Sequence, residues 1–397
     1  MKRSNNSFLN LESLEDRLTP AFDFFYNPAG DIWTVTQVQD DGDATVTVDA
    51  ITNDLVIDDG AGGPVTVGVA LGSLTINLMD NSSGDLTVEL DEFLFGNVSI
   101  NLGNGGDFDG DGVRDLTLNG ASNFIGGNLR MTGGTGDQSA VISGNVALSV
   151  GGSTYIEFGL GDDSVTTDGD VSIGGNLTLV NVNQWNSSDT VTVGGSVSMN
   201  VRLDNIFSAF DLVVGGATVI GGNFTYYGGN GEDNAFLSND VIIGGSVNIN
   251  LGNDVLGVDD QEVDMSGATI GGNVTIIGGT ITGFENIDTD INTVIGGNIY
   301  INTGTLGDTG DDVDLQGTIG GRSVTIITSI NDDTVSYNMT GNNPRLFASL
   351  GLGDDDFTLG ADVDLSYLYI DFGFGSDSYT TLFPGPYTFR VYLRNLP

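Results

Sequence analysis

Apolar and polar residues alternate along short segments that recur through most of this chain. In residues 173–179, with the sequence IGGNLTL, Leu177 and Leu179 flank Thr178, and residues 243–249 show the same alternation. A period of two is typical of a β-strand with one buried face. No segment carries a comparable helical stripe, and 62 glycines disfavour helices throughout. The pattern therefore predicts an all-β protein.

Copies of this segment recur at a nearly constant interval. They begin at Leu71, Phe95, Ile125, Val150, Val193, Ile220, Ile243, Ile270, Ile295 and Ile319. The eight intervals between Gly126 and Gly320 average roughly 24 residues, which is typical of solenoids. Such a repeat, with two or three short strands separated by Gly, Asn and Asp, predicts one coil of a parallel β-helix. Because the intervals vary, we expect a right-handed solenoid rather than the left-handed type built on strict hexapeptides.

Most copies carry a Gly-Gly pair followed by Asn or Ser. We expect the glycines to adopt positive φ at a tight corner. The position after them should stack from coil to coil as a ladder of amides and hydroxyls that satisfies backbone groups. The ladder positions are Asn97, Asn128, Asn176, Asn223, Asn273, Asn298, Ser73, Ser153, Ser196 and Ser246.

The repeats divide the chain into four regions. Residues 71–379 hold the solenoid. Residues 22–70 contain strand-like runs without the Gly-Gly signature, and we predict that they form an N-terminal β cap over the first coil. In residues 380–397 two prolines interrupt the pattern, and a capping strand is expected there. Residues 1–21 differ from the rest and hold three of the ten basic residues.

The first region carries a short motif that suggests export. It resembles the N-terminal segment of many large surface and secreted proteins of planctomycete-type bacteria. The matching residues are Leu11, Glu12, Leu14, Glu15, Arg17 and Pro20. The resemblance implies an extracellular or cell-surface location in a bacterium. The segment lacks the apolar core of about 7 to 15 residues of an ordinary secretory signal. The alternative is therefore a short leader that does not direct export.

Charge and composition exclude several function classes. The net charge is −44, with one lysine and nine arginines. Such a chain repels phosphate backbones and anionic lipid, so we expect neither nucleic-acid binding nor membrane-surface binding. No apolar run approaches the ~20 residues of a membrane-spanning helix. Without cysteine or histidine, the chain has no disulfides, no thiolate zinc site and no Ser-His or Cys-His catalysis.

One interval between repeats contains a calcium-loop motif. Asp107, Asp109, Asp111 and Asp115, with Gly112, spell D-x-D-x-D-G-x-x-D. Alternate carboxylates wrap a hard cation, and the glycine permits the sharp turn. The glutamate that closes an EF-hand loop is missing and no helices flank the motif. The loop therefore resembles the isolated calcium loops of extracellular bacterial modules, and an acidic solvated insertion is the alternative.

A second family of acidic motifs recurs once per coil or less. GLGDDSV contains Asp162 and Asp163, GNGEDNA contains Asp233, and GLGDDDF contains Asp354 and Asp355. Weaker copies lie in residues 133–141, 330–335 and 373–379. They resemble degenerate copies of the glycine- and aspartate-rich nonapeptide of calcium-binding haemolysin-type proteins, which implies bound calcium (Ca²⁺).

Electrostatics gives a separate reason to expect cations at these turns. Carboxylates ~5 Å apart on successive coils repel each other by about 0.8 kcal/mol even at the dielectric constant of water. Bound divalent ions or salt would relieve this repulsion. The alternative is that Asp occupies these turns for Asx-turn geometry alone, with its charge in water.

These features predict a non-catalytic extracellular or cell-surface rod, structural or adhesive and stabilised by calcium. Its expected partners are calcium, surface polysaccharide or other copies of itself. One alternative is a carbohydrate-active enzyme, a polysaccharide lyase or glycoside hydrolase, because many pectin-cleaving enzymes use a right-handed β-helix. Such enzymes need a cleft of long loops with clustered acidic residues, whereas most connections here are short. Ice binding is a third possibility, but the outward row mixes Thr with Arg130, Asn248 and Tyr300.

Overall fold

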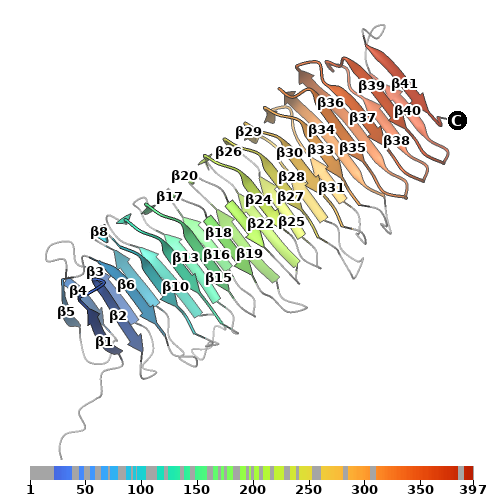
Figure 1. The fold of residues 1–397 in the computed structure, drawn as a ribbon. Helices are drawn as coiled ribbons and strands as arrows, with labels where there is room; N and C mark the ends of the chain where they lie inside the picture. Colours follow the sequence, from blue (N-terminus) through green and yellow to red (C-terminus); the bar gives the residue numbers. More distant parts are fainter. Residues whose placement is uncertain are drawn as a thin grey trace, which may run out of the picture.

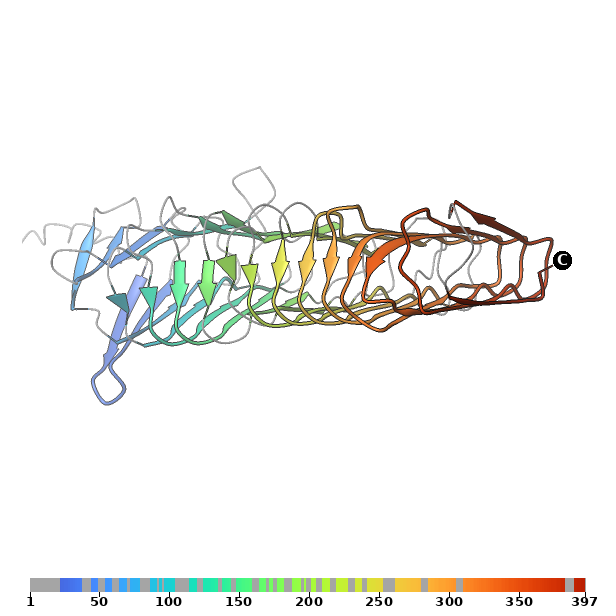
Figure 2. The same ribbon diagram turned by 90° about the horizontal axis from the view of Figure 1, so that it is seen from above.

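The chain folds into an elongated rod whose short strands lie across the long axis (Figure 1). The computed structural model describes residues 22–37, 44–48, 54–58, 64–69, 72–78, 86–90, 93–94, 96–103, 114–119, 124–134, 138–143, 148–158, 164–168, 171–173, 177–181, 188–193, 196–197, 201–204, 209–214, 219–227, 233–237, 241–252, 261–279, 285–304, 310–382 and 389–396. Over these ranges every element is a strand, and no helix has the length and apolarity to cross a membrane. The first and last strands lie at opposite ends of the rod (Figures 1 and 2).

One long face of the rod is a 16-stranded sheet, called here the first sheet. Its strands, in spatial order, are β1 (Phe22–Asn27), β2 (Ile32–Gln37), β6 (Ser73–Asn77), β9 (Val98–Asn101), β12 (Leu129–Thr132), β15 (Thr154–Phe158), β18 (Leu177–Asn181), β21 (Val201–Asp204), β24 (Phe224–Tyr227), β27 (Val247–Asn250), β30 (Val274–Ile277), β33 (Ile299–Asn302), β35 (Ser323–Ile327), β37 (Arg345–Ser349), β39 (Tyr367–Asp371) and β41 (Arg390–Arg394). All neighbours from β2 onward are parallel.

A second sheet forms another long face. Its strands are β3 (Ala44–Val48), β4 (Asp54–Asp58), β5 (Val65–Val69), β7 (Leu86–Leu90), β10 (Arg114–Asn119), β13 (Gln138–Ser143), β16 (Ser164–Asp168), β19 (Ser188–Val193), β22 (Ala209–Val214), β25 (Asp233–Leu237), β28 (Gln261–Asp264), β31 (Glu285–Asp288), β34 (Asp312–Ile319), β36 (Thr334–Gly341), β38 (Asp356–Leu359) and β40 (Ser378–Thr381). Antiparallel pairs occur among the first strands of both sheets, between β1 and β2, β3 and β4, and β4 and β5.

Short strands form a third column between the two sheets. They are β8 (Phe93–Leu94), β11 (Phe124–Ile125), β14 (Leu148–Val150), β17 (Val171–Ile173), β20 (Ser196–Val197), β23 (Val219–Ile220), β26 (Ile242–Ile243), β29 (Thr269–Ile270) and β32 (Val294–Ile295). The column joins the second sheet at β34, which pairs with both β31 and β32. In chain order, one coil therefore consists of a second-sheet strand, a short strand and a first-sheet strand.

The inward side chains of successive strands stack into one apolar core. Val274 pairs with Ile299 and Ile276 pairs with Ile301, and all four are at most 2% exposed. Burying each such side chain contributes about 1.5–3 kcal/mol. Thr275, between Val274 and Ile276, faces outward. The alternation predicted from the sequence is thus observed, and the parallel β-helix is confirmed.

The Asn and Ser ladder is also confirmed. The side-chain oxygen accepts the backbone N–H of the same position one coil later at Ser73, Asn97, Asn128, Asn223, Ser246, Asn273 and Asn298. Asn176 and the side chain of Ser196 lie outside the described residues. Asn128 N donates to Asn97 Oδ1 at 2.8 Å, and Asn298 N donates to Asn273 Oδ1 at 2.8 Å. Ser246 joins the same row, because its Oγ accepts from Asn273 N at 3.0 Å. The ladder therefore supplies backbone groups at the corner with partners from the neighbouring coil.

The Gly-Gly pairs line up in a column, but the reason predicted for them is wrong. None of the described pairs has positive φ. A Cβ on Gly272 would instead lie 2.4 Å from Ser246 Oγ and 2.7 Å from the Gly245 carbonyl oxygen. A Cβ on Gly297 would lie 2.4 Å from Asn273 Oδ1. Glycine is required because adjacent coils and the ladder side chains approach too closely for any larger residue.

Candidate functional site

The structure describes only part of the predicted metal-binding residues. Asp107, Asp109, Asp111, Asp162 and Asp163 lie outside the described residues.

Asp115 and Asp233 lie in strands of the second sheet. Asp115 pairs with Ser139 of β13, and Asp233 pairs with Phe210 of β22. Of the predicted residues, only Asp354 and Asp355 have described side chains. They precede β38, at the corner where the chain enters the second sheet.

At this corner one aspartate from each of four successive coils is buried. Asp311, Asp333, Asp355 and Asp377 each stand directly before the strand that follows, and their exposed fractions are 2%, 1%, 0% and 7%. We call these four residues the aspartate ladder. The strands that follow them pair in parallel register, so consecutive members lie about 4.8 Å apart along the rod.

Hydrogen bonds connect the ladder from coil to coil. The N–H of Asp311 donates to Asp333 Oδ1 at 2.9 Å, that of Asp333 to Asp355 Oδ1 at 3.0 Å, and that of Asp355 to Asp377 Oδ1 at 3.0 Å. Each bond spans 22 residues of sequence. One oxygen of each accepting carboxyl is thereby fixed in place by the backbone of the preceding coil.

The second oxygen of three ladder carboxyls has no partner. Oδ2 of Asp333, Asp355 and Asp377 is buried and accepts no hydrogen bond from the described residues. The Ser329 hydroxyl, in the same part of the coil, is also buried and has no hydrogen-bond partner within the described ranges. A buried acceptor left unsatisfied costs about 1–3 kcal/mol, and more when it is charged. Binding of a proton or a cation to these oxygens would therefore stabilise the folded state.

Burial also changes the acidity of the ladder. Desolvation raises the pKa of Asp333 to about 7. The neighbouring carboxylates of Asp311 and Asp355 raise it further, whereas hydrogen bonds to Asp333 lower it. Desolvation likewise raises the pKa of Asp355 to about 7, assisted by Asp377. In the folded chain, ionising adjacent ladder carboxyls is therefore unfavourable unless a cation compensates their negative charge.

An exposed row of acidic side chains runs beside the buried ladder. Asp354 N donates to Asp332 Oδ1 and Ser376 N donates to Asp354 Oδ1, both at 2.7 Å. Residues adjacent in an extended segment point to opposite sides, so Asp354 faces water while Asp355 faces the interior. Gly353, with φ of +146°, begins this turn, so positive φ is required here rather than at the Gly-Gly pairs.

A third group of acids lies on the outer face of the second sheet. Asp264, Asp288 and Asp314 occupy the same register position in β28, β31 and β34. Partial burial raises the pKa of Asp288, and the negative charge of Asp314 adds to this. Partial burial also raises the pKa of Asp312, and the negative charge of Asp314 adds to this effect.

The donor set of the aspartate ladder suits a hard cation. Calcium takes oxygen ligands, and the ladder offers carboxylate oxygens without hydrogen-bond partners on consecutive coils. Within the part of the chain that the structure describes, no three acidic side chains by themselves form a metal-binding group. A cation held here would need one carboxylate from each of two coils and further oxygens from the backbone.

The sequence pattern missed three members of the ladder. Asp333 and Asp377 lie in the weaker copies of the second acidic motif but were not named as ligands, and Asp311 lies in no copy, although all three share the spacing Asp-x-apolar with Asp355. Their common interval of 22 residues was the signal that could have found them. Comparison of the chain with protein-family models, curated proteins and solved structures found no match.

Proposed function

We propose that this protein is a non-catalytic structural or adhesive rod of the bacterial cell surface or exterior, stabilised by calcium. The observation that carries the proposal is the column of buried carboxylate oxygens on three successive coils that have no hydrogen-bond partner in the part of the chain that the structure describes. A solenoid without metal could place these positions in water or fill them with Asn. The chain instead buries an ionisable group in each of four consecutive coils.

Calcium is the compensation that matches this arrangement at neutral pH. An isolated buried carboxylate is strongly disfavoured unless it is protonated, paired or bound to metal. No arginine or lysine is paired with the ladder among the described residues. A divalent ion between coils would neutralise two carboxylates and bind the folded chain only, so that the stabilisation grows with the logarithm of the ion concentration above the dissociation constant.

The proposed location and partners follow from charge and from the N-terminal motif. A chain with net charge −44 and no cysteine suits an environment outside the cell, where calcium is plentiful. The motif in residues 1–21 resembles export segments of bacterial surface proteins. We propose surface polysaccharide or other copies of the rod as partners, because both fit a long lateral face that carries polar side chains.

Calcium binding is tested by calorimetry and by thermal melting followed by circular dichroism. The full chain is stripped with chelator at neutral pH and titrated with calcium, and with magnesium as a control. We expect saturable calcium binding and a higher melting temperature in calcium than in chelator. The D333N/D355N double variant should lose part of the binding and part of this shift. Equal melting with calcium and with chelator would reject calcium stabilisation.

A carbohydrate-active enzyme is the second candidate. The row of Asp264, Asp288 and Asp314 favours it, because glycoside hydrolysis uses neighbouring carboxyl groups, one of them an acid whose pKa is raised as that of Asp288 is. The test is release of reducing ends or unsaturated products from pectin, alginate and xylan. Activity that disappears in D288N would support this alternative over the structural rod.

A further inference from the structure

The C-terminal end of the first sheet concentrates aromatic side chains on its outer face. One outward row carries mainly small polar side chains over β24, β27, β30 and β35. Its members there are Thr225, Asn248, Thr275 and Thr325, and Tyr300 of β33 stands between the last two. In the last three strands the same row continues as Phe347, Tyr369 and Tyr392. Three aromatic residues therefore follow one another at this end of the row, whereas Tyr155 and Tyr300 stand singly among the preceding strands.

The last three strands together present a cluster of aromatic rings that are tilted by 34° to 42° against one another. Phe347, Tyr367, Tyr369 and Tyr392 form what we call the aromatic platform. The ring centroids of Phe347 and Tyr367 lie 5.6 Å apart, those of Phe347 and Tyr369 6.4 Å, and those of Tyr367 and Tyr392 5.4 Å. Phe347 is 36% exposed and Tyr392 is 49% exposed. The rings therefore offer an exposed apolar surface supported by a rigid sheet.

Arginines frame the platform. Arg345, Tyr367 and Arg390 occupy one register position in β37, β39 and β41. The two guanidinium groups thus flank a tyrosine from strands roughly 10 Å apart. Both arginines are exposed, and among the described residues neither has an ion-pair partner. In a chain with ten basic residues and a net charge of −44, this local cluster is unusual.

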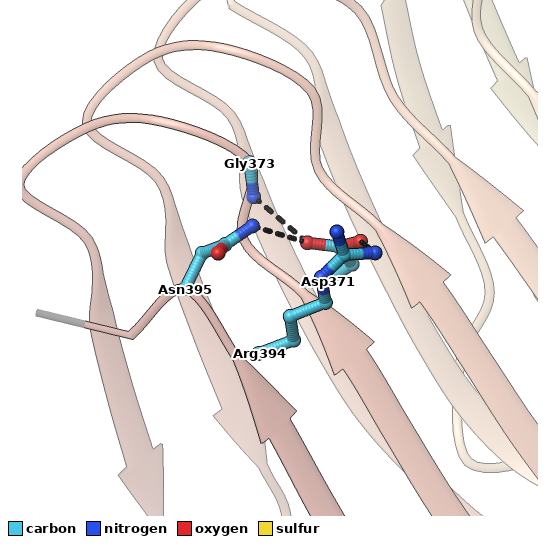
Figure 3. Close-up of polar contacts among 4 residues, drawn as sticks. All are labelled: Asp371, Gly373, Arg394 and Asn395. Atoms are coloured by element: carbon cyan, nitrogen blue, oxygen red, sulfur yellow. Dashed lines mark hydrogen bonds and ion pairs between the residues drawn. The ribbon is translucent and has the colours of Figure 1, made fainter.

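The third arginine of the cluster is held in place by its neighbours. Arg394 Nη1 lies 3.0 Å from Asp371 Oδ2, and Asn395 Nδ2 donates to Asp371 Oδ1 at 2.8 Å (Figure 3). Gly373 N donates to the same oxygen at 3.3 Å. Asp371 is thereby occupied within the sheet. It neutralises Arg394 and leaves Arg345 and Arg390 to meet an external anion.

We infer that the aromatic platform with Arg345 and Arg390 is a binding site for an extended anionic polysaccharide, such as a polymer of uronic acids. Aromatic faces pack against the C–H faces of sugar rings, and guanidinium groups bind carboxylates through charge-assisted hydrogen bonds. Successive strands along the rod are ~4.8 Å apart, close to the advance of one sugar in an extended polymer. One sugar could therefore meet each strand.

This site deepens the proposed role in contacts with surface polysaccharide, and it rests on that role for where the ligand is met. The calcium proposal is independent, because none of the platform residues belongs to the aspartate ladder. Neutral sugars would use the rings alone and leave two guanidinium groups without partners. An acidic protein surface would use the arginines without the planar ring contacts. A neutral sugar oligomer and an acidic polypeptide are therefore the comparison ligands in the test.

The test is calorimetric titration of the full chain, at constant calcium, with a soluble hexamer of mannuronate. We expect binding that weakens with added salt. The R345Q/R390Q variant should bind on the order of tenfold more weakly, and Y392A should also lose affinity. R130Q, which removes one charge far from the platform, and T275A, on the same row, should bind like the wild type. All variants should keep the calcium-dependent shift in melting temperature.

Two comparison ligands separate the alternatives. Cellohexaose tests the rings without charge, and polyglutamate tests charge without rings; each should bind at least about tenfold more weakly than the mannuronate hexamer. Equal binding of polyglutamate would overturn the inference in favour of an acidic protein partner, including a second copy of the chain. Equal binding of cellohexaose, or equal affinity in R345Q/R390Q and wild type, would overturn the role of the arginines. Absence of hexamer binding while the calcium shift persists would reject this site and leave the calcium proposal standing.

Discussion

Replacing Asp355 by Asn tests whether the aspartate ladder binds protons in the folded rod. Asp355 is fully buried and accepts the Asp333 N–H at 3.0 Å, while its other oxygen has no partner among the described residues. Asn keeps the shape and one accepting oxygen but does not ionise. D355N therefore removes one titrating group while preserving the hydrogen bond that joins two coils.

The size of the effect follows from the pKa. Burial raises the pKa of Asp355 from 3.8 to about 7. At about 1.4 kcal/mol per pKa unit, the folded state favours the protonated carboxyl by about 4 kcal/mol. Between these two pH values the folded chain binds more protons than the unfolded chain. This contribution to stability is therefore complete below pH 3.8 and is lost as the pH rises to about 7.

The assay is urea unfolding followed by circular dichroism between pH 5 and pH 8, in chelator and in calcium. Urea is suitable because it does not screen charges. In chelator, the free energy of unfolding of the wild type should fall by about 1.3 kcal/mol per pH unit for each such carboxyl between pH 5 and 6, and by about half as much near pH 7. D355N should show a shallower slope. D362N, an exposed aspartate on a neighbouring turn, should follow the wild type.

Calcium should reverse the trend. It binds the ionised ladder, so its stabilisation should grow as the pH rises and protons leave. Two results would refute this reasoning. One is wild-type stability that rises steadily from pH 5 to pH 8 in chelator. The other is a pH profile of D355N that runs parallel to those of the wild type and D362N.

Four further predictions concern the fold. G297A should destabilise the rod by about 2–3 kcal/mol in urea unfolding, because its Cβ would meet Asn273 Oδ1; a loss below about 0.5 kcal/mol would contradict the close approach. N298A should cost about 1 kcal/mol, because two N–H groups of the next coil lose their acceptor. F357A should cost about 3–5 kcal/mol, since this ring is fully buried, and an unchanged urea midpoint would contradict it. Burial opposes ionisation of Asp290, but hydrogen bonds from Gly267, Asn292 and Thr293 lower its pKa below 3.8. D290A should therefore be less stable than the wild type at neutral pH, and the difference in stability should become small once the pH falls below that pKa.

The sequence predicts the architecture well because one physical rule repeats in every coil. Alternating residues such as Val274, Thr275 and Ile276 place one face inward, and the period fixes the stacking. The Asn row was equally predictable, since an amide at the same position of each coil has a backbone N–H within reach. Such regularities need no knowledge of distant contacts.

The role of the glycines and the inner acids was harder to predict. Gly272 has a backbone conformation open to other residues, and only the position of Ser246 in the previous coil excludes a side chain. Asp354 and Asp355 are identical neighbours in sequence, yet one faces water and the other the core. Which of them is buried depends on the strand phase, and a shift of one residue would exchange their environments.

The interval of 22 residues in the aspartate ladder limits how the length of this protein can change. Removing residues 333–354 would bring Asp355 to the place of Asp333 and preserve the hydrogen-bonded order of the aspartate ladder, although it would remove Arg345 and Phe347 from the aromatic platform. Removing a single residue from a strand would instead turn its apolar side chains to the solvent. Insertions and deletions are therefore tolerated in multiples of a full turn, and a gene for such a protein can grow or shrink by duplication or loss of whole units.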